Sequence, residues 1–176
     1  MPSSLAGALR GPRALFFAFA FALSLAALPG CESGPDAAAM QADVEAALQA
    51  KDYAGAVAKA DEALKVEAIS KEPAKAWRFE SLRLQGLAEG GNGAEVVAGL
   101  ERLTGAFPTQ INPALYRALA DKLRAAGDGP GAVSVLDAGK KKYPDDPSFQ
   151  AAIDELAKTG DPAEIEALKA LGYLGD

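Results

Sequence analysis

Apolar residues recur at spacings of three and four from Ala37 to the end of the chain, which is typical of helices with one buried face. No stretch alternates apolar and polar residues over the length of a strand, and β-branched residues do not cluster. Eight helices are predicted on this basis, at 37–50, 53–67, 73–90, 94–106, 113–126, 130–142, 147–158 and 162–171. The pattern therefore predicts an all-α domain.

The starts of three predicted helices share one arrangement, a polar capping residue followed by proline at the first helical position. It occurs at Asn112-Pro113, Asp146-Pro147 and Asp161-Pro162. Glu164 stands three residues after Asp161, which predicts a capping box. Near the end of the chain, Ile165, Leu168 and Leu171 are expected to seal the last packing surface of the domain.

The turns between helices recur along the chain. Lys51-Asp52-Tyr53, Gly91-Asn92-Gly93 and Gly127-Asp128-Gly129 lie 40 and then 36 residues apart. Small or apolar residues follow each turn at helical spacing, namely Ala56, Ala60 and Ala63, then Val96, Leu100 and Leu103, then Ala132, Leu136 and Gly139. With Pro108 and Pro144 closing the later units, residues 37–144 resemble the tetratricopeptide repeat (TPR), a helix–turn–helix of 34 residues.

The resemblance implies an antiparallel helix-pair solenoid with about three repeats in 37–144 and a capping helix pair in 145–176. The third unit matches best, with Tyr116, Leu119, Ala120 and Leu123 at the motif's first-helix positions. The second unit departs from the motif, because Glu80 and Arg83 occupy apolar positions. We interpret this as a shifted register that places Trp77, Phe79 and Leu82 in the core. An unrelated alanine-rich bundle is the alternative.

In this family, ligands usually bind the surface formed by the first helix of each unit. The matching positions are Gln41, Glu45, Gln49, Arg78, Ser81, Gln85, Glu89, Arg117, Asp121 and Arg124. The last three share one helical face, since they are four and three residues apart. Two interpretations are open for them. The paired guanidinium groups bind a carboxylate such as a peptide C-terminus, or the three residues form an ion triad that satisfies itself.

The N-terminal segment has a different composition. Arg10 and Arg13 precede an uncharged run, residues 14–30, which leads to the only cysteine, Cys31. This arrangement resembles a bacterial lipoprotein signal peptide, which implies a signal helix in 1–30, cleavage before Cys31, a lipid on its sulfur and a polar tether over 31–36. Glu32, where an aspartate would favour inner-membrane retention, favours the outer membrane. An uncleaved membrane anchor and an ordinary secretory signal are the alternatives.

Charge and composition exclude several classes of function. The net charge is −6, and removal of 1–30 leaves 16 basic and 24 acidic residues, which argues against nucleic-acid binding. The chain has no histidine and a single cysteine, so it has no Ser-His-Asp triad, imidazole metal ligand or intramolecular disulfide. Asp145-Asp146 resembles a catalytic carboxylate pair, but Asp146 is explained as a helix cap. We therefore expect no enzyme activity, no metal and no cofactor.

We therefore expect the protein to be a lipid-anchored scaffold lipoprotein of the bacterial cell envelope, facing the periplasm. Its helical repeats are expected to bind a protein or peptide partner. Analogy with the family suggests roles in envelope, pilus or cell-wall assembly. The alternatives are a structural oligomerisation module and a carboxylate-based envelope enzyme.

Overall fold

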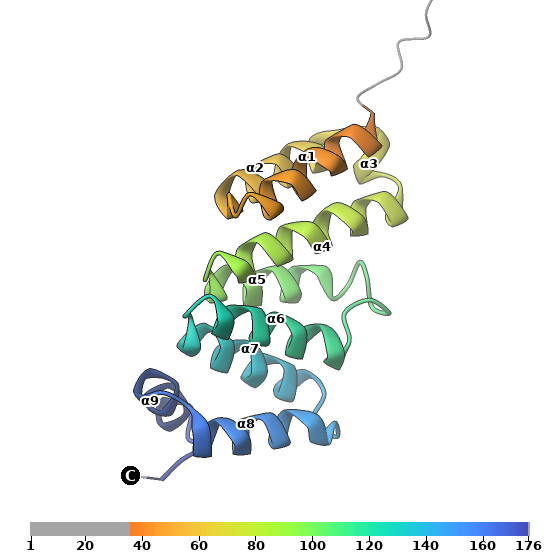
Figure 1. The fold of residues 1–176 in the computed structure, drawn as a ribbon. Helices are drawn as coiled ribbons and strands as arrows, with labels where there is room; N and C mark the ends of the chain where they lie inside the picture. Colours follow the sequence, from red (N-terminus) through yellow and green to blue (C-terminus); the bar gives the residue numbers. More distant parts are fainter. Residues whose placement is uncertain (1–35, 176) are drawn as a thin grey trace, which may run out of the picture. The chain divides into compact units, whose positions relative to one another are not determined.

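A computed structural model describes residues 36–175, which form nine helices in two layers (Figure 1). The helices are α1 (Ala37–Gln49), α2 (Tyr53–Lys65), α3 (Glu67–Ser70), α4 (Pro73–Glu89), α5 (Gly93–Leu103), α6 (Pro113–Ala125), α7 (Gly129–Lys142), α8 (Pro147–Thr159) and α9 (Pro162–Ala170). In one layer, α1, α4, α6 and α8 contact one another in that order. In the other, α5, α7 and α9 contact one another in order, and α2 packs on α1 and α4. The predicted signal helix and Cys31 lie outside the described residues.

The all-helical class is confirmed, and the eight predicted helices are present in residues 36–175, with corrections at two helix ends. The helix predicted over 94–106 ends at Leu103. The predicted helix over 53–67 ends at Lys65, because Val66 adopts an extended backbone with ψ at 119°. The short helix α3 follows and buries Ile69 against α2 and α4. A single buried isoleucine in a four-residue helix leaves too little periodicity to be recognised in the sequence.

The three predicted caps are confirmed. The side chains of Asn112, Asp146 and Asp161 accept hydrogen bonds from the backbone N–H groups of Leu115, Ser148 and Glu164 at 3.1, 2.9 and 2.8 Å. The Glu164 carboxylate accepts the Asp161 N–H at 2.9 Å and completes the capping box. These bonds satisfy N–H groups that a helix start leaves without partners.

The three recurring turns share one backbone structure. Lys51, Gly91 and Gly127 have φ values of 59°, 71° and 86°, in the left-handed region. At each turn, two N–H groups bond back to the helix in the pattern of a Schellman motif. The outer bonds run from Asp52 to Ala47, from Asn92 to Leu87 and from Asp128 to Leu123. The turns repeat at the spacings that the sequence predicts, although Lys51 holds a conformation that favours glycine.

The buried side chains form two clusters that meet in α4. Phe79 belongs to the cluster of α1 and α2, whereas Leu84 belongs to the larger cluster that extends to α9. Trp77 is half-buried and packs on Phe107, with ring centroids 5.3 Å apart. The side chains of α4 thus pack in two different cores, which accounts for the departure of the second unit from the repeat motif.

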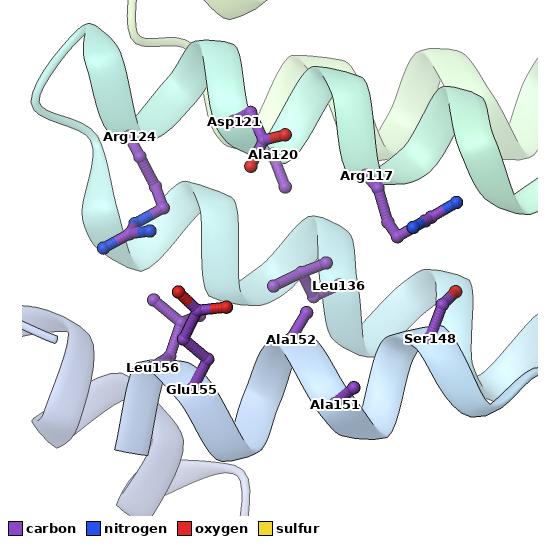
Figure 2. A pocket seen from close by; sticks show the side chains of 10 residues that line it. All are labelled: Arg117, Ala120, Asp121, Arg124, Leu136, Ser148, Ala151, Ala152, Glu155 and Leu156. Atoms are coloured by element: carbon purple, nitrogen blue, oxygen red, sulfur yellow. The ribbon is translucent and has the colours of Figure 1, made fainter. Parts of the chain in front are cut away.

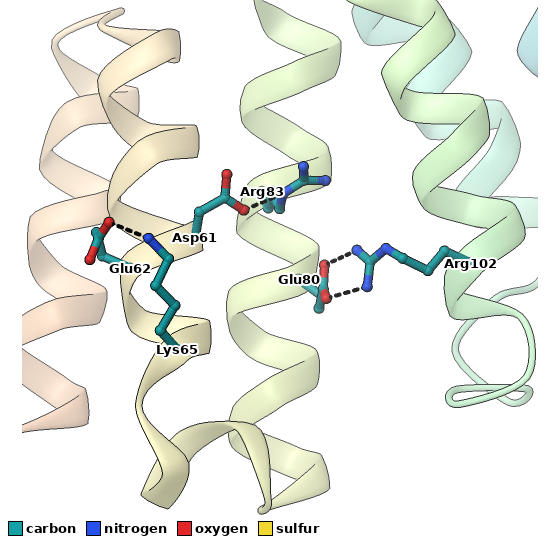
Figure 3. Close-up of polar contacts among 6 residues, drawn as sticks. All are labelled: Asp61, Glu62, Lys65, Glu80, Arg83 and Arg102. Atoms are coloured by element: carbon teal, nitrogen blue, oxygen red, sulfur yellow. Dashed lines mark hydrogen bonds and ion pairs between the residues drawn. The ribbon is translucent and has the colours of Figure 1, made fainter.

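Polar residues at the expected apolar positions of α4 are held by ion pairs (Figure 3). Glu80 is 6% exposed, and its two oxygens accept hydrogen bonds from Arg102 at 2.8 and 2.7 Å. Arg83 donates to Asp61 of α2 at 2.6 Å. A buried carboxylate that receives a two-pronged guanidinium keeps its charge satisfied.

The C-terminal segment packs differently from the prediction in one respect. Leu168 is fully buried and Ile165 is half-buried, but Leu171 is 41% exposed. Tyr173 takes its place, since the turn at Gly172 directs the Tyr173 hydroxyl to Asp137 of α7 at 2.9 Å. The hydrogen bond between Tyr173 and Asp137 therefore holds the C-terminal segment on α7.

Candidate functional site

The ten predicted groove positions lie on α1, α4 and α6, which are neighbours in one layer. All of them are exposed or half-buried. Between α1 and α4, a shallow depression is lined by Glu45, Arg78 and Ser81 together with Ala74, Trp77 and Leu82. The structure therefore places the predicted positions on neighbouring helices, and three of them line this depression.

Four of the predicted residues, on α1 and α4, bond to each other in pairs. Gln41 donates to Glu45 at 2.5 Å, and Gln85 donates to Glu89 at 2.9 Å. Glu89 also receives the ammonium group of Lys122 from α6 at 2.5 Å. The bond from Lys122 ties α4 to α6, and the three contacts together leave fewer free polar groups on α1 and α4.

A groove of about 300 Å³ lies between α6 and α8 (Figure 2). From α6 it is lined by Arg117, Ala120, Asp121 and Arg124; Leu136 of α7 also contributes. Its other wall belongs to α8, with Ser148, Ala151, Ala152, Glu155 and Leu156. Small side chains on both helices keep the groove open, while charged groups stand along its edges.

The two arginines of the groove point away from each other (Figure 2). Arg124 donates from Nε to the buried Glu164 of α9 at 2.6 Å, and this hydrogen bond raises the pKa of Arg124. The self-satisfied triad is therefore wrong, since the ion partner of Arg124 is Glu164 rather than Asp121. The structure also does not bring the guanidinium groups of Arg117 and Arg124 together as a clamp.

Arg117 lies at the opposite end of the groove, near the start of α8. Its charge helps to lower the pKa of Asp146, after the larger effects of the hydrogen bonds that Asp146 receives from the hydroxyl and N–H of Ser148. No ion pair of Arg117 is present among residues 36–175. The charge of Arg117 is thus balanced in part by the carboxylate of Asp146, which caps α8.

Sequence reasoning missed the wall that α8 provides, because 145–176 was interpreted only as a cap. A signal for it exists, since Ser148, Ala152 and Glu155 are four and three residues apart and share one helical face. That spacing is also typical of any solvated helix face, so it indicates a groove only once α6 is known to lie alongside.

Residues 36–175 hold no group of three or more acidic or cysteine side chains arranged to bind a metal ion. None of the helices in this range has both the length and the apolar character that a membrane crossing requires. The α6/α8 groove is therefore the candidate binding site within residues 36–175.

Comparison of the chain with family models, with curated proteins and with solved structures finds no match.

Proposed function

We propose that the chain is a membrane-anchored scaffold lipoprotein of the cell envelope that binds a protein or peptide partner through a TPR-like helical stack. The single observation that carries the binding function is the open groove between α6 and α8. Its mixture of small, apolar and charged side chains suits a peptide segment, which offers both side-chain methylenes and polar groups. The TPR-like assignment is supported by the three helix pairs that share one Schellman turn.

The binding function is tested by photo-crosslinking in the cells that make the protein. A photoreactive phenylalanine analogue replaces Ala151, an exposed residue of the groove, or Ala98, an exposed residue of α5 in the other layer. We expect a discrete adduct from position 151 and none from position 98. Equal adducts from both positions, or no adduct from position 151, would contradict the proposal.

The anchor is proposed on the sequence of residues 1–31 alone. Lipidation of Cys31 predicts that the full chain incorporates labelled palmitate in a bacterial host and that Cys31→Ser does not. Both proteins are compared at equal expression by fluorography. Equal labelling would rule out the lipid anchor and leave the groove proposal standing, because the groove involves no residue before 117.

A further inference from the structure

The two ends of the stack differ in the polarity of their outermost helices. α1 begins the layer that α8 ends. The exposed residues of α8 are mostly polar or charged, as the outer face of a terminal repeat must be to remain in water. Those of α1 are mostly apolar, namely Ala38, Ala39, Ala42 and Ala46, with Asp43 and Gln49 as the polar ones. The α1 end therefore lacks the polar cover that the α8 end has.

An apolar groove of about 200 Å³ lies between α1 and α2 at this end, where Met40 and Ala58 line it from the two helices. Its charged lining is Asp43 on α1 and Lys59 and Glu62 on α2. Glu62 pairs with Lys65 at 2.6 Å (Figure 3). Asp43 and Lys59 form no ion pair with each other or with any other residue of 36–175. The two walls of the groove thus carry one unpaired charge each, of opposite sign.

We propose that this α1/α2 face is the contact surface between two copies of the chain, related by a two-fold axis. In such a contact a surface meets its own copy, so Asp43 of each copy faces Lys59 of the other. Both charges then gain a partner, and the apolar groove beside Met40 is covered on both copies. The polar α8 end offers no matching surface, so the contact closes at two copies instead of growing into a filament.

The size of the face determines how firmly the two copies hold together. α1 and α2 have 13 residues each, so each is about 20 Å long at ~1.5 Å per residue and about 10 Å wide. The face therefore offers roughly 400 Å² per copy and ~800 Å² in total, which is in the range of weak and transient interfaces. A weak contact is best trapped by crosslinking in the cells that make the protein.

The test places a photoreactive phenylalanine analogue at Gln49, an exposed residue of α1, in the full chain. We expect an adduct of twice the mass of the chain. Asp43→Lys or Lys59→Asp alone should weaken this adduct at least about fivefold, because both pairs across the contact become like charges. The matched controls are Asp154→Lys and Lys158→Asp, which make the same changes at exposed residues of α8 and should leave the adduct unchanged.

The decisive step is to express the two α1/α2 variants together with different tags. Asp43→Lys presents two cations at the contact and Lys59→Asp presents two anions, so each repels its own copy and attracts the other. The double-mass adduct should therefore return and carry both tags. A folding defect in one variant is not repaired by the other, so the return of the adduct also excludes that cause.

Three results would overturn the inference. They are an adduct that does not return in the mixture, an undiminished adduct in either single variant, and an adduct at Gln49 that contains only a different protein. None of them bears on the α6/α8 groove, because the two surfaces share no residue.

Discussion

The carboxylate of Asp128 joins the starts of two helices in neighbouring units. Its Oδ1 accepts the N–H of Gly131 at 2.9 Å and caps α7, while its Oδ2 accepts the N–H of Gly93 at 2.9 Å and caps α5. Asn92, the residue before α5, makes no side-chain cap of its own. A residue in one unit therefore supplies the cap that its neighbour lacks.

The double cap predicts a larger loss for Asp128 than for its counterpart in the first unit. Asp52 caps only α2, through the N–H of Gly55 at 3.0 Å. Asp52→Ala is expected to lower the free energy of unfolding by about 1 kcal/mol and Asp128→Ala by about 2 kcal/mol. Urea unfolding of both variants measures the difference. Equal losses would mean that the bond to Gly93 contributes no stability.

Gly93 itself allows α5 to approach α7. A Cβ at this position would lie 2.4 Å from the Cα of Gly131, so the two backbones would have to separate. Gly93→Ala is expected to cost about 1–3 kcal/mol, as overpacking typically does. Gly105→Ala is the control, because nothing lies within 4 Å of its Cβ position. Thermal unfolding should show a lower melting temperature for Gly93→Ala and an unchanged one for Gly105→Ala.

The two groove arginines are expected to respond differently to truncation. Arg124→Ala leaves the buried carboxylate of Glu164 without its ion partner and is expected to cost about 1–3 kcal/mol. Arg117→Ala removes an exposed side chain and should change stability by less than about 0.5 kcal/mol. A calorimetric scan of each variant distinguishes them, and an equal melting temperature for both would contradict the assigned ion pair.

The pair of Glu80 and Arg102 predicts a rescue experiment. Arg102→Ala leaves a carboxylate that is 6% exposed without a partner and is expected to cost about 1–3 kcal/mol. Replacing both residues with methionine should restore much of that loss, because the Glu80 substitution removes the buried carboxylate that Arg102→Ala leaves without a partner. A double variant that is no more stable than Arg102→Ala would contradict this account.

Tyr173 predicts a sensitivity to alkali. Burial, together with the hydrogen bond to Asp137, raises the pKa of Tyr173 to about 12. An unfolded tyrosine titrates near ~10, so the folded state keeps a proton that the unfolded state loses. The stability contributed by Tyr173 is therefore complete below about pH 10 and is lost between about pH 10 and 12.

The measurement compares wild type with Tyr173→Phe in melting temperature across that pH range. Wild type should lose stability more steeply, and the two curves should converge at the alkaline end. Tyr116 and Tyr143 also have raised pKa values through burial, but they titrate in both proteins. Parallel curves would mean that Tyr173 contributes nothing to the pH dependence.

The helix starts and the helical class were predictable because they depend on neighbouring residues. Asp161 and Glu164 lie within one turn, so their capping box appears in the sequence as well as in the structure. The three turns were predictable for the same reason, since Gly91 and Gly127 favour the left-handed backbone.

Contacts between distant residues were not predictable from local patterns. Glu164 pairs with Arg124 across 40 positions, and Asp128 reaches Gly93 across 35. The groove was missed for the same reason, because Asp121 and Glu155 are brought to facing walls only when α8 packs on α6. Glu80 and Arg83 of α4 depart from the repeat motif in the sequence, and their ion partners Arg102 and Asp61 each lie 22 positions away along the chain.

The position of α4 in both cores has a consequence for how the domain unfolds. Units of an ordinary repeat array fray from their ends, because each one contacts only its neighbours. Here Phe79 and Leu84 belong to different cores but to one rigid helix, so neither core can melt without loosening the residues that hold the other. We therefore expect a single cooperative transition, in which the fluorescence of Trp77 and the far-UV circular dichroism of all helices change at the same temperature.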